Sequence, residues 1–354
     1  MRFSAVSHSM NCMSTSIDRF QCPWNISEQD FPSASDEHNK SVFFLRHAIL
    51  APSSHNTQPW KFAVRDGQID VLIDTSRWLR VADADQRELH ISVGSAIENL
   101  FVATEHFGHT CSVSYFPLAD RQDLAATITL NREGQTKGPK VSELYGAIAR
   151  RRTSRRPFSD RPVAEEDKVR LTACCEEHGL SLHLLEDSRR RHRLSDLTMR
   201  ADRKQFADSA WRRELGYWLG QGVFGTSWLK SKMEKLVVTH ANLGKSIAKH
   251  DSRLLISAPV FAVITSHDDS RELQVRAGRA FERIALAATV MDISVHPMSQ
   301  VLELPELKQE LAELLPDGAS VPQHAFRLGY AAADESHTPR RSLDEVLVRT
   351  TTSS

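Results

Sequence analysis

Residues 52–60 read Pro52-Ser53-Ser54-His55-Asn56-Thr57-Gln58-Pro59-Trp60. Every position between the two prolines carries a polar side chain, and the prolines fix the backbone at both ends and prevent one continuous helix. Such a loop can present hydrogen-bonding groups to the polar edge of a planar ligand. An ordinary turn is the alternative, because Ser, Asn and Pro are also the residues that turns favour.

A second polar segment reads Arg150-Arg151-Arg152-Thr153-Ser154-Arg155-Arg156-Pro157-Phe158. Its five arginines and two hydroxyls stand where a helical pattern gives way to extended chain. Guanidinium forks and hydroxyls suit a phosphate dianion, which accepts bidentate charge-assisted hydrogen bonds. A solvated charged face is the alternative, because most charge runs have that role.

The first segment resembles, almost letter for letter, the Ser-Ser-x-Asn-x-Gln-Pro-Trp signature of the FMN-dependent nitroreductase superfamily. Residues 151–155 resemble its Arg-Arg-Ser-x-Arg motif, with Thr153 in the usual Ser position and one residue inserted before Phe158. In that family the first segment reaches across a dimer interface to the partner's flavin, and the arginine motif binds the FMN phosphate and pyrimidine ring. Because Thr153 keeps the hydroxyl, the resemblance still implies phosphate binding here.

Two further segments resemble parts of the same family. Residues 338–347 resemble its closing segment, in which a basic residue completes the phosphate site; Arg340 takes this role, with Arg341 as the fallback. Residues 293–300 resemble the turn beside the reactive edge of the flavin, although a plain helix-to-loop turn is an equal reading. The resemblance therefore implies FMN binding by Pro52, Ser53, Ser54, Asn56, Arg151, Arg152, Thr153, Arg155, Met298, Ser299, Gln300, Arg340 and Arg341.

The order of these motifs predicts a single flavin site. Ordinary members carry the arginine motif before the Ser-Ser-x-Asn loop, so that a homodimer holds two equivalent sites. Here the loop comes first, and Arg46-His47 is a poor substitute for the missing first-half arginines. This order resembles the Acg-type subgroup, in which one chain imitates the dimer, over about residues 42–347. The resemblance implies an α+β, nitroreductase-like fold whose two related halves form a pseudo-dimer around one FMN.

An internal repeat agrees with this organisation. The segments Gly94-Ser95-Ala96-Ile97-Glu98-Asn99-Leu100 and Gly278-Arg279-Ala280-Phe281-Glu282-Arg283-Ile284 share Gly, Ala, Glu and two apolar positions at the same spacing. Each lies within a long amphipathic helical pattern. Two helices of one kind can agree by chance, but duplication of one fold unit is the favoured interpretation.

Hydrophobic periodicity predicts a mixture of helices and strands without a strict βαβ alternation, which favours an α+β class. We expect helices over residues 41–51, 88–107, 145–152, 165–178, 187–219 and 275–291, and strands over 61–64, 69–73, 112–116, 125–130, 180–185, 259–265 and 324–331. A linker rich in Gly and Pro at 131–140 marks a domain boundary. The predicted divisions are a disordered extension or docking arm (1–38), a first nitroreductase-like half (39–138) and a second nitroreductase-like half (139–350).

Composition restricts the kinds of partner. The 354 residues carry 45 Lys plus Arg and 45 Asp plus Glu, so no net charge attracts nucleic acid or an acidic membrane. The five cysteines lack Cys-x-x-Cys spacing, which favours a reducing, cytoplasmic setting without zinc. No apolar run is long enough for a signal sequence or a membrane span. We therefore expect a cytoplasmic protein with a small-molecule partner, and with no nucleic acid, membrane or metal.

One competing motif is Gly220-Gln221-Gly222-Val223-Phe224-Gly225, which satisfies the Gly-x-Gly-x-x-Gly pattern of dinucleotide-binding loops. That reading needs a strand before the loop and an acidic residue about 20 positions later. Residues 211–219 have a helical pattern instead, and Gly244-Lys245 occupies the acidic position. The segment is therefore interpreted as a flexible loop and a candidate lid over the flavin.

The motifs together imply an FMN-dependent oxidoreductase of the nitroreductase type. NAD(P)H would serve as the transient reductant, and the acceptor would be a nitroaromatic, a quinone or a similar molecule, reduced by ping-pong hydride transfer. The alternative is a non-catalytic protein that sequesters FMN under a lid. No protein side chain is assigned as an acid or base, and the chain is expected to be a monomer that mimics a dimer.

Overall fold

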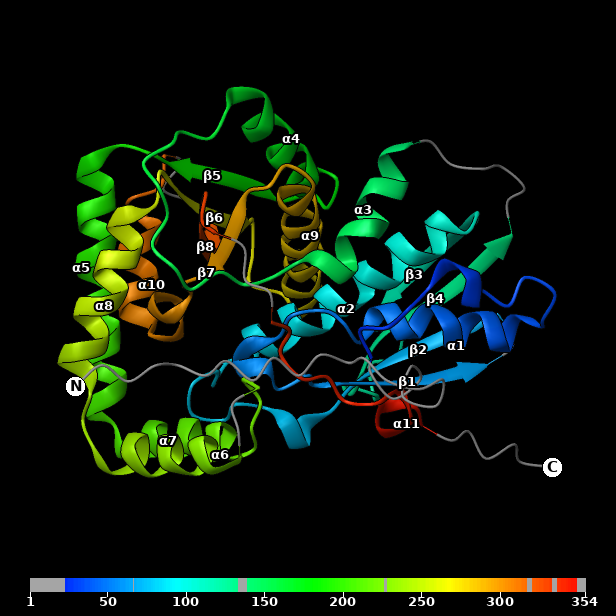
Figure 1. The fold of residues 1–354 in the computed structure, drawn as a ribbon, viewed down its shortest axis with the longest axis horizontal. Coiled ribbons are helices and arrows are strands. Elements are labelled where there is room, and N and C mark those ends of the chain that lie inside the picture. The colour runs from blue at the N-terminus through cyan, green and yellow to red at the C-terminus, as the bar shows by residue number, and fades with distance from the viewer. Residues whose placement is uncertain are drawn as a thin grey trace.

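The computed structural model describes residues 23–65, 67–132, 139–225, 228–316, 320–332 and 336–348. Within these residues the strands form two four-stranded antiparallel sheets (Figure 1). The first sheet has the order β1-β2-β4-β3, and the second has the order β5-β6-β8-β7. Helices pack against both sheets, so the predicted α+β class is confirmed.

The first half follows the predicted elements closely. It contains α1 (Glu37–Ala48), β1 (Trp60–Arg65), β2 (Gln68–Ile73), α2 (Arg87–His106), β3 (His109–Tyr115) and β4 (Leu124–Arg132), with short 3-10 helices at Glu28–Asp30, Ser54–Asn56 and Thr75–Arg77. The alternation of Ile69, Val71 and Ile73 predicts β2, and the apolar helical stripe predicts α2, which is buried along almost its whole length.

The second half adds several elements that the sequence patterns do not predict. It contains α3 (Pro139–Arg150), α4 (Glu165–Glu176), β5 (Ser181–Leu185), α5 (Ser188–Ala207), α6 (Ser209–Gly220), α7 (Trp228–His240), α8 (Gly244–Ser257), β6 (Val260–Ser266), α9 (Arg271–Val290), β7 (Ser294–Pro297), a 3-10 helix at Gln300–Glu303, α10 (Pro305–Ala312), β8 (Val321–Gly329) and α11 (Leu343–Val346). The unpredicted elements are α7, α8, β7, α10 and α11. A break at Asp208 divides the predicted helix over 187–219 into α5 and α6.

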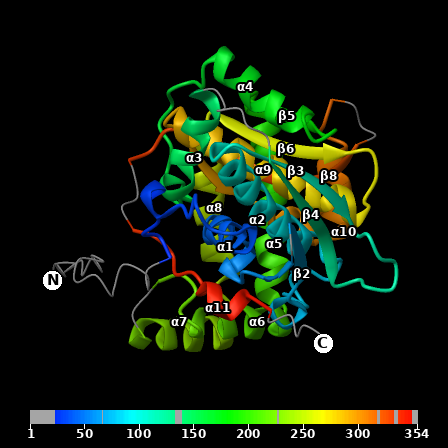
Figure 2. The same ribbon diagram turned by 90° about the vertical axis from the view of Figure 1, so that its right-hand side faces the viewer.

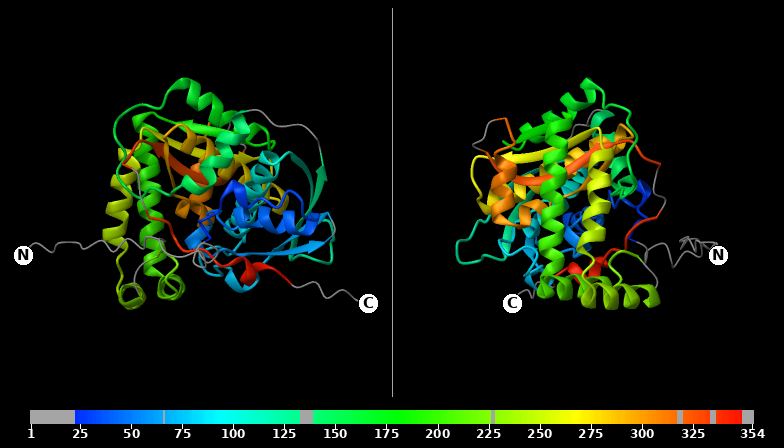
Figure 3. Two further views of the ribbon diagram at one scale, coloured as in Figure 1. Left: turned by 45° about the vertical axis from the view of Figure 1, so that its right-hand side comes forward. Right: turned by 90° about the vertical axis from the view of Figure 1, so that its left-hand side faces the viewer.

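The two halves repeat one pattern, because each places a long helix directly after the second strand of its sheet. The main difference is an insertion. No described helix separates β1 from β2, whereas helices α5 to α8 separate β5 from β6. In Figures 1 and 3 the inserted helices form an arm, with α5 and α8 side by side and the α6–α7 pair beneath them.

Helices α2 and α9 form the centre of the contact between the halves (Figure 2). They cross at the repeat glycines, where an added Cβ on Gly94 would lie 2.0 Å from the carbonyl oxygen of Val275. Likewise, a Cβ on Gly278 would lie 2.0 Å from the carbonyl oxygen of Ile91. Both distances are far below van der Waals contact, so only glycine permits this helix approach. The reciprocal clash explains why the repeat keeps a glycine at the same place in both helices.

Each terminal segment of the described chain packs on the first half. Phe31 stacks on Phe107 with ring centroids 4.2 Å apart and packs against the first hydrophobic core. The prediction of a disordered extension is therefore wrong for residues 23–38, because aromatic burial anchors them; residues 1–22 lie outside the described residues. At the other end, the Val348 amide donates to the Phe62 carbonyl at 2.8 Å, which attaches the C-terminal segment to β1.

The division between halves at residue 139 stays a prediction. Residues 133–138 of the expected linker lie outside the described residues, and α3 contributes Tyr145, Ala147 and Ile148 to the first core. Among the described helices, none combines the length and the apolar character that crossing a membrane requires.

Candidate functional site

A cavity with two adjoining lobes lies between the halves. The basic lobe, of about 550 Å³, is lined by Arg151, Arg152 and Arg340, together with Trp24 and His337. The inner lobe, of about 330 Å³, extends between α2 and the inserted helices. Eight residues line both lobes: Pro52, Ser53, His55, Thr153, Arg155, Leu215, His296 and Pro297. The structure therefore brings the polar loop and the arginine segment to one place.

The polar loop follows a strained path along the cavity. His55, Asn56 and Gln58 have φ values of 48°, 53° and 53°, in the left-handed region that non-glycine residues rarely adopt. Each costs on the order of 1–3 kcal/mol, and such strain concentrates at functional sites. The Ser53 hydroxyl accepts from the Gln58 amide at 2.8 Å, and the Ser54 amide donates to the Ser92 hydroxyl at 3.2 Å. These bonds hold the loop against α2.

Arg151 is the best-placed cation for a ligand in the basic lobe. The residue is only 5% exposed, and its Nε lies 3.2 Å from the Glu282 carboxylate. Its guanidinium donates no hydrogen bond to the part of the chain that the structure describes, although it lines the lobe. Arg152 lies beside it and contacts His337 Nε2 at 2.6 Å. Arg151 therefore combines a buried charge, a single acidic partner and a place on the wall of a space that a ligand can enter.

The positive charge in the basic lobe exceeds what the protein compensates. Arg340 is held by the Asn56 side chain at 3.0 Å and by the Leu50 carbonyl at 3.1 Å. Burial, followed by the nearby Arg151, lowers the pKa of Arg340 to about 9. Burial and three arginines likewise lower the pKa of His337 to about 4. A site that disfavours its own cations in this way favours an anion, and a phosphate fits both the charge and the donor geometry.

Trp24 and His337 are residues of this lobe that the motifs do not identify. Their rings lie 4.0 Å apart, and the Trp24 indole donates to the Thr338 carbonyl at 3.1 Å. The Arg340 guanidinium lies 4.7 Å from the Trp24 ring centroid, within the range of a cation–π contact. The N-terminal segment thus covers the basic lobe, a contact between chain ends that no local sequence pattern indicates.

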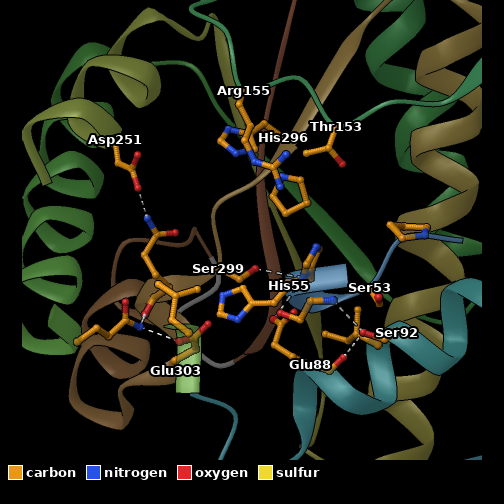
Figure 4. Close-up of a pocket in the computed structure, with 18 of the residues that line it drawn as sticks. Ser53, His55, Glu88, Ser92, Thr153, Arg155, Asp251, His296, Ser299 and Glu303 are labelled. Carbon is orange, nitrogen blue, oxygen red and sulfur yellow. Dashed lines mark hydrogen bonds and ion pairs between the residues drawn. The ribbon is translucent and has the colours of Figure 1, made fainter. Parts of the chain in front are cut away.

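The inner lobe is lined by polar groups from both halves. Figure 4 shows Arg155, His296 and Thr153 at one end, and Glu88 and Ser92 at the other. Arg327 donates to His296 Nδ1 at 3.0 Å, so the neutral ring carries its proton on Nε2 and presents a donor there. Burial, together with Arg327, keeps the pKa of His296 well below its usual value.

The far end of the inner lobe contains an ion pair that the motifs also miss. Burial tends to raise the pKa of Glu88, but Arg87 and His324 outweigh it and lower that pKa to about 2. Ser299, a predicted site residue, contacts His324 Nδ1 at 3.1 Å. The inserted helices close this lobe with apolar groups that include Phe206, Trp211 and Leu215.

Three predicted site residues take other roles. Met298 does not line either lobe; it is 2% exposed and packs in a hydrophobic core with α5 and α10. Arg341 does not line the cavity and pairs with Asp74 at 3.2 Å, so of these two candidates for the phosphate role it is Arg340 that lines the basic lobe. Asn56 reaches the lobe, but its amide is occupied by the Val223 carbonyl at 2.6 Å and the Pro339 carbonyl at 2.9 Å.

The other ten predicted site residues line one or both lobes of the cavity. They are Pro52, Ser53, Ser54, Arg151, Arg152, Thr153, Arg155, Ser299, Gln300 and Arg340.

The glycine-rich segment 220–225 follows a helix, not a strand, which contradicts the dinucleotide-binding interpretation. Its Phe224 lines the basic lobe, and the Arg155 guanidinium lies 5.4 Å from that ring.

A second crevice lies where the repeat predicts the counterpart of the inner lobe. Counted from the repeat glycines, Glu272, Arg276 and Arg279 of α9 correspond to Glu88, Ser92 and Ser95 of α2. Two small hydroxyl side chains are thus replaced by guanidinium groups. Arg279 donates to Glu98 at 2.9 Å and to Tyr115 at 2.8 Å, and Arg276 lies 2.7 Å from Glu272. Arginine side chains therefore line the counterpart crevice, which keeps a volume of about 480 Å³.

Comparisons with known proteins find relatives along nearly the whole chain. Two Mycobacterium tuberculosis proteins bear the name "Putative NAD(P)H nitroreductase", Rv3131 and acg, and both are 28% identical to this chain. The first matches over 90% of this chain and 92% of its own length, the second over 84% and 92%. The crystal structure of the FMN-dependent nitroreductase NfnB from Mycobacterium smegmatis with NADPH aligns with 58% of this chain and 97% of its own, at 16% identity and a TM-score of 0.38. No family model matches.

Proposed function

We propose that this chain, a member of the NAD(P)H nitroreductase family, binds one FMN between its halves and passes electrons from NAD(P)H to a small-molecule acceptor. The main support is the basic lobe, where Arg151, Arg152 and Arg340 are crowded without sufficient negative charge. This lobe continues into a second space lined by the polar loop, as a ligand with a phosphate and a flat ring requires. One flavin per chain is supported by the counterpart crevice, where arginines stand in place of the two serines that line the inner lobe.

The residues of the cavity fit FMN. Arg151, Arg152 and Arg340 would hold the phosphate, with Thr153 and Arg155 at the junction of the lobes. When bound, FMN supplies hydride acceptance from a nicotinamide and electron return to an acceptor in two separate half-reactions. The loop backbone and the Nε2 donor of His296 would orient the ring edge, while the inserted helices exclude water from the inner lobe.

A non-catalytic flavin holder is the second candidate. It is favoured by the apolar roof of the inner lobe, in which Phe206, Trp211 and Leu215 narrow the approach for a nicotinamide. Both functions require the same phosphate site. They differ in whether the bound flavin exchanges electrons with NAD(P)H.

Anaerobic stopped-flow mixing of the flavin-loaded protein with NADPH or NADH separates the two. We expect the visible flavin absorbance to bleach within seconds and to return on addition of a quinone or nitroaromatic. Absorbance that stays unchanged over minutes with both nicotinamides would contradict the enzymatic function and support a flavin holder. A protein that takes up no FMN would contradict both.

We further propose a reducing, cytoplasmic setting and a monomeric state. Among the described residues, Cys111, Cys174 and Cys175 are not joined in disulfides, which suits a reducing environment. The contact between α2 and α9 places within one chain the kind of interface that a second subunit would otherwise supply.

Flavin binding is expected to depend on pH through Glu282. Burial raises the pKa of Glu282 to about 7, and the nearby Arg151 opposes this shift. A phosphate dianion on Arg151 would raise that pKa further, so the bound state holds more protons than the free state above pH 7. The affinity for FMN should therefore fall as the pH rises from 7 to 9, by up to about tenfold per unit.

The measurement is the FMN dissociation constant at pH 7, 8 and 9, a range above the second phosphate pKa of about 6. Glu282→Gln should remove most of the decrease, whereas Glu143→Gln, on the exposed face of α3, should retain it. Equal pH profiles for the wild type and Glu282→Gln would show that this carboxyl does not sense the phosphate.

A further inference from the structure

Three carboxyl groups form one wall of the inner lobe. Asp202 comes from α5, Asp251 from α8 and Glu303 from the short 3-10 helix after β7. We call these three residues the acidic wall. Figure 4 shows Asp251 and Glu303 on the opposite side of the cavity from Ser53 and Ser92, so the acidic wall faces the polar loop across the space. Two of its three carboxyls come from the insertion, which has no counterpart in the first half.

Amide side chains, and not cations, contact the acidic wall. The single Gln300 Nε2 atom donates to Asp202 Oδ1 at 3.3 Å and to Asp251 Oδ2 at 3.2 Å. Gln205 Nε2 donates to Glu303 Oε2 at 2.7 Å. The other Asp202 oxygen, Oδ2, is buried without a hydrogen-bond partner, although Asp202 is only 3% exposed and lines the lobe. A buried carboxylate oxygen with no donor costs free energy that a ligand donor can recover.

No charge in the described part of the chain neutralises the acidic wall directly. None of its three carboxyls forms an ion pair within 4.0 Å among the described residues. Cations act on the acidic wall only from a distance: His250, Arg327 and Arg155 oppose the rise that burial causes in the pKa of Asp251. Arg87 opposes the rise in the pKa of Glu303, but it pairs with Glu88 at 2.6 Å. Burial, followed by the Asp251 charge, raises the pKa of Asp202 to about 7, and burial with Glu88 raises that of Glu303. Both shifts arise mainly from burial, and they show that the charged carboxylate forms are incompletely compensated in the free protein.

A divalent metal does not explain this charge, because the described residues contain no group of three or more His, Cys, Asp or Glu side chains placed to hold an ion. The other surfaces of the lobe restrict the ligand further. Phe206, Trp211, Leu215, Ile247 and Phe281 line it and suit a flat apolar body. The lobe therefore combines an apolar slot with unpaired carboxyls at one wall.

We propose that the acidic wall is an acceptor subsite, which selects a flat molecule bearing a protonated amine or amidine. The apolar body lies among the aromatic side chains, and the cationic N–H groups bond to the Asp202 and Asp251 carboxylates. This proposal rests on the proposed function, because it names the class of acceptor. It gives the insertion a role in substrate selection, since α5 and α8 supply the two aspartates.

The test compares two nitroaromatics of nearly equal shape at pH 7, 4-nitrobenzylamine as the cation and 4-nitrobenzyl alcohol as the neutral control. With flavin-loaded protein and NADPH, we expect kcat/KM for the cation to exceed that for the alcohol by about tenfold or more. Asp202→Asn should reduce this ratio to near one, and Asp251→Asn should reduce it in the same direction. Asp196→Asn, an exposed carboxyl on the same helix, should leave the ratio unchanged.

A binding measurement keeps this proposal separate from catalysis. Calorimetric titration of the flavin-loaded protein with benzylamine and benzyl alcohol should show tighter binding of the amine, and Asp202→Asn should remove the difference. Visible flavin spectra and unfolding midpoints verify that each variant folds. If the amine binds no more tightly than the alcohol, the subsite proposal is overturned even when NADPH reduces the flavin. If the amine is preferred but the flavin is not reduced, the subsite stands and the proposed enzymatic function fails.

Discussion

Replacing Arg151 with alanine is expected to weaken FMN binding by roughly 30- to 4,000-fold. Truncation of one member of a buried charge pair costs about 2–5 kcal/mol, and each 1.4 kcal/mol corresponds to about tenfold in affinity. Arg151 is 5% exposed and has donors that no described residue uses, so a desolvated phosphate would lose its best-placed cation. Fluorescence titration of the flavin-free protein measures the change.

The matched control is Arg150→Ala, one position earlier. Arg150 is exposed, and its Nε donates to the Gly146 carbonyl at 3.2 Å, so this variant removes the same charge without touching the lobe. Arg151→Lys should recover part of the affinity, because a lysine supplies the charge without the bidentate fork. Wild-type FMN affinity in Arg151→Ala would refute the phosphate assignment.

Replacing Gly278 with alanine is expected to destabilise the protein by about 3 kcal/mol or more, because overpacked contacts cost about 1–3 kcal/mol even where neighbours can move. The new Cβ would lie 2.0 Å from the Ile91 carbonyl oxygen and 2.7 Å from its carbonyl carbon, which are backbone atoms of α2. Relief requires the two helices to separate, which would also open the cavity. Urea unfolding followed by circular dichroism gives the free energy.

Gly146 provides the control for Gly278→Ala. It also lies in a helix, but an added Cβ meets nothing within 4 Å. Gly146→Ala should therefore leave stability unchanged or raise it by up to about 1 kcal/mol, because alanine is the better helix former. Gly94→Ala should resemble Gly278→Ala. Equal unfolding free energies for Gly278→Ala and the wild type would show that the helices do not meet at this glycine.

Much of the fold could be predicted from the sequence because its core elements have strong local periodicity. The apolar stripes of α2 and α9 and the continuous apolar run of β6 are typical of buried elements. Helices α7 and α8 were not predicted, since they follow a glycine-rich run and their positions are set by tertiary contacts. The packing of Phe31 on the first core likewise depends on residues distant in the chain.

The motifs identify which segments meet at the site, but not which side chains point into it. Adjacent residues of an extended chain point to opposite sides, so Arg340 reaches the basic lobe while Arg341 pairs with Asp74. Met298 shows the same limit, because its neighbours Ser299 and Gln300 line the inner lobe while its own side chain enters the core. The acidic wall belongs largely to the insertion, whose residues resemble no motif and approach the cavity only after folding.

The central claim is that one chain holds one FMN by its phosphate in the cavity between the halves. The most direct test is titration of the flavin-free protein with FMN and, separately, with riboflavin, which has the same ring but no phosphate. We expect saturation at one FMN per chain and binding of riboflavin weaker by about 100-fold or more, since the three arginines would lose their anion. Saturation at two FMN per chain, no uptake of FMN, or equal affinity for riboflavin would contradict this account.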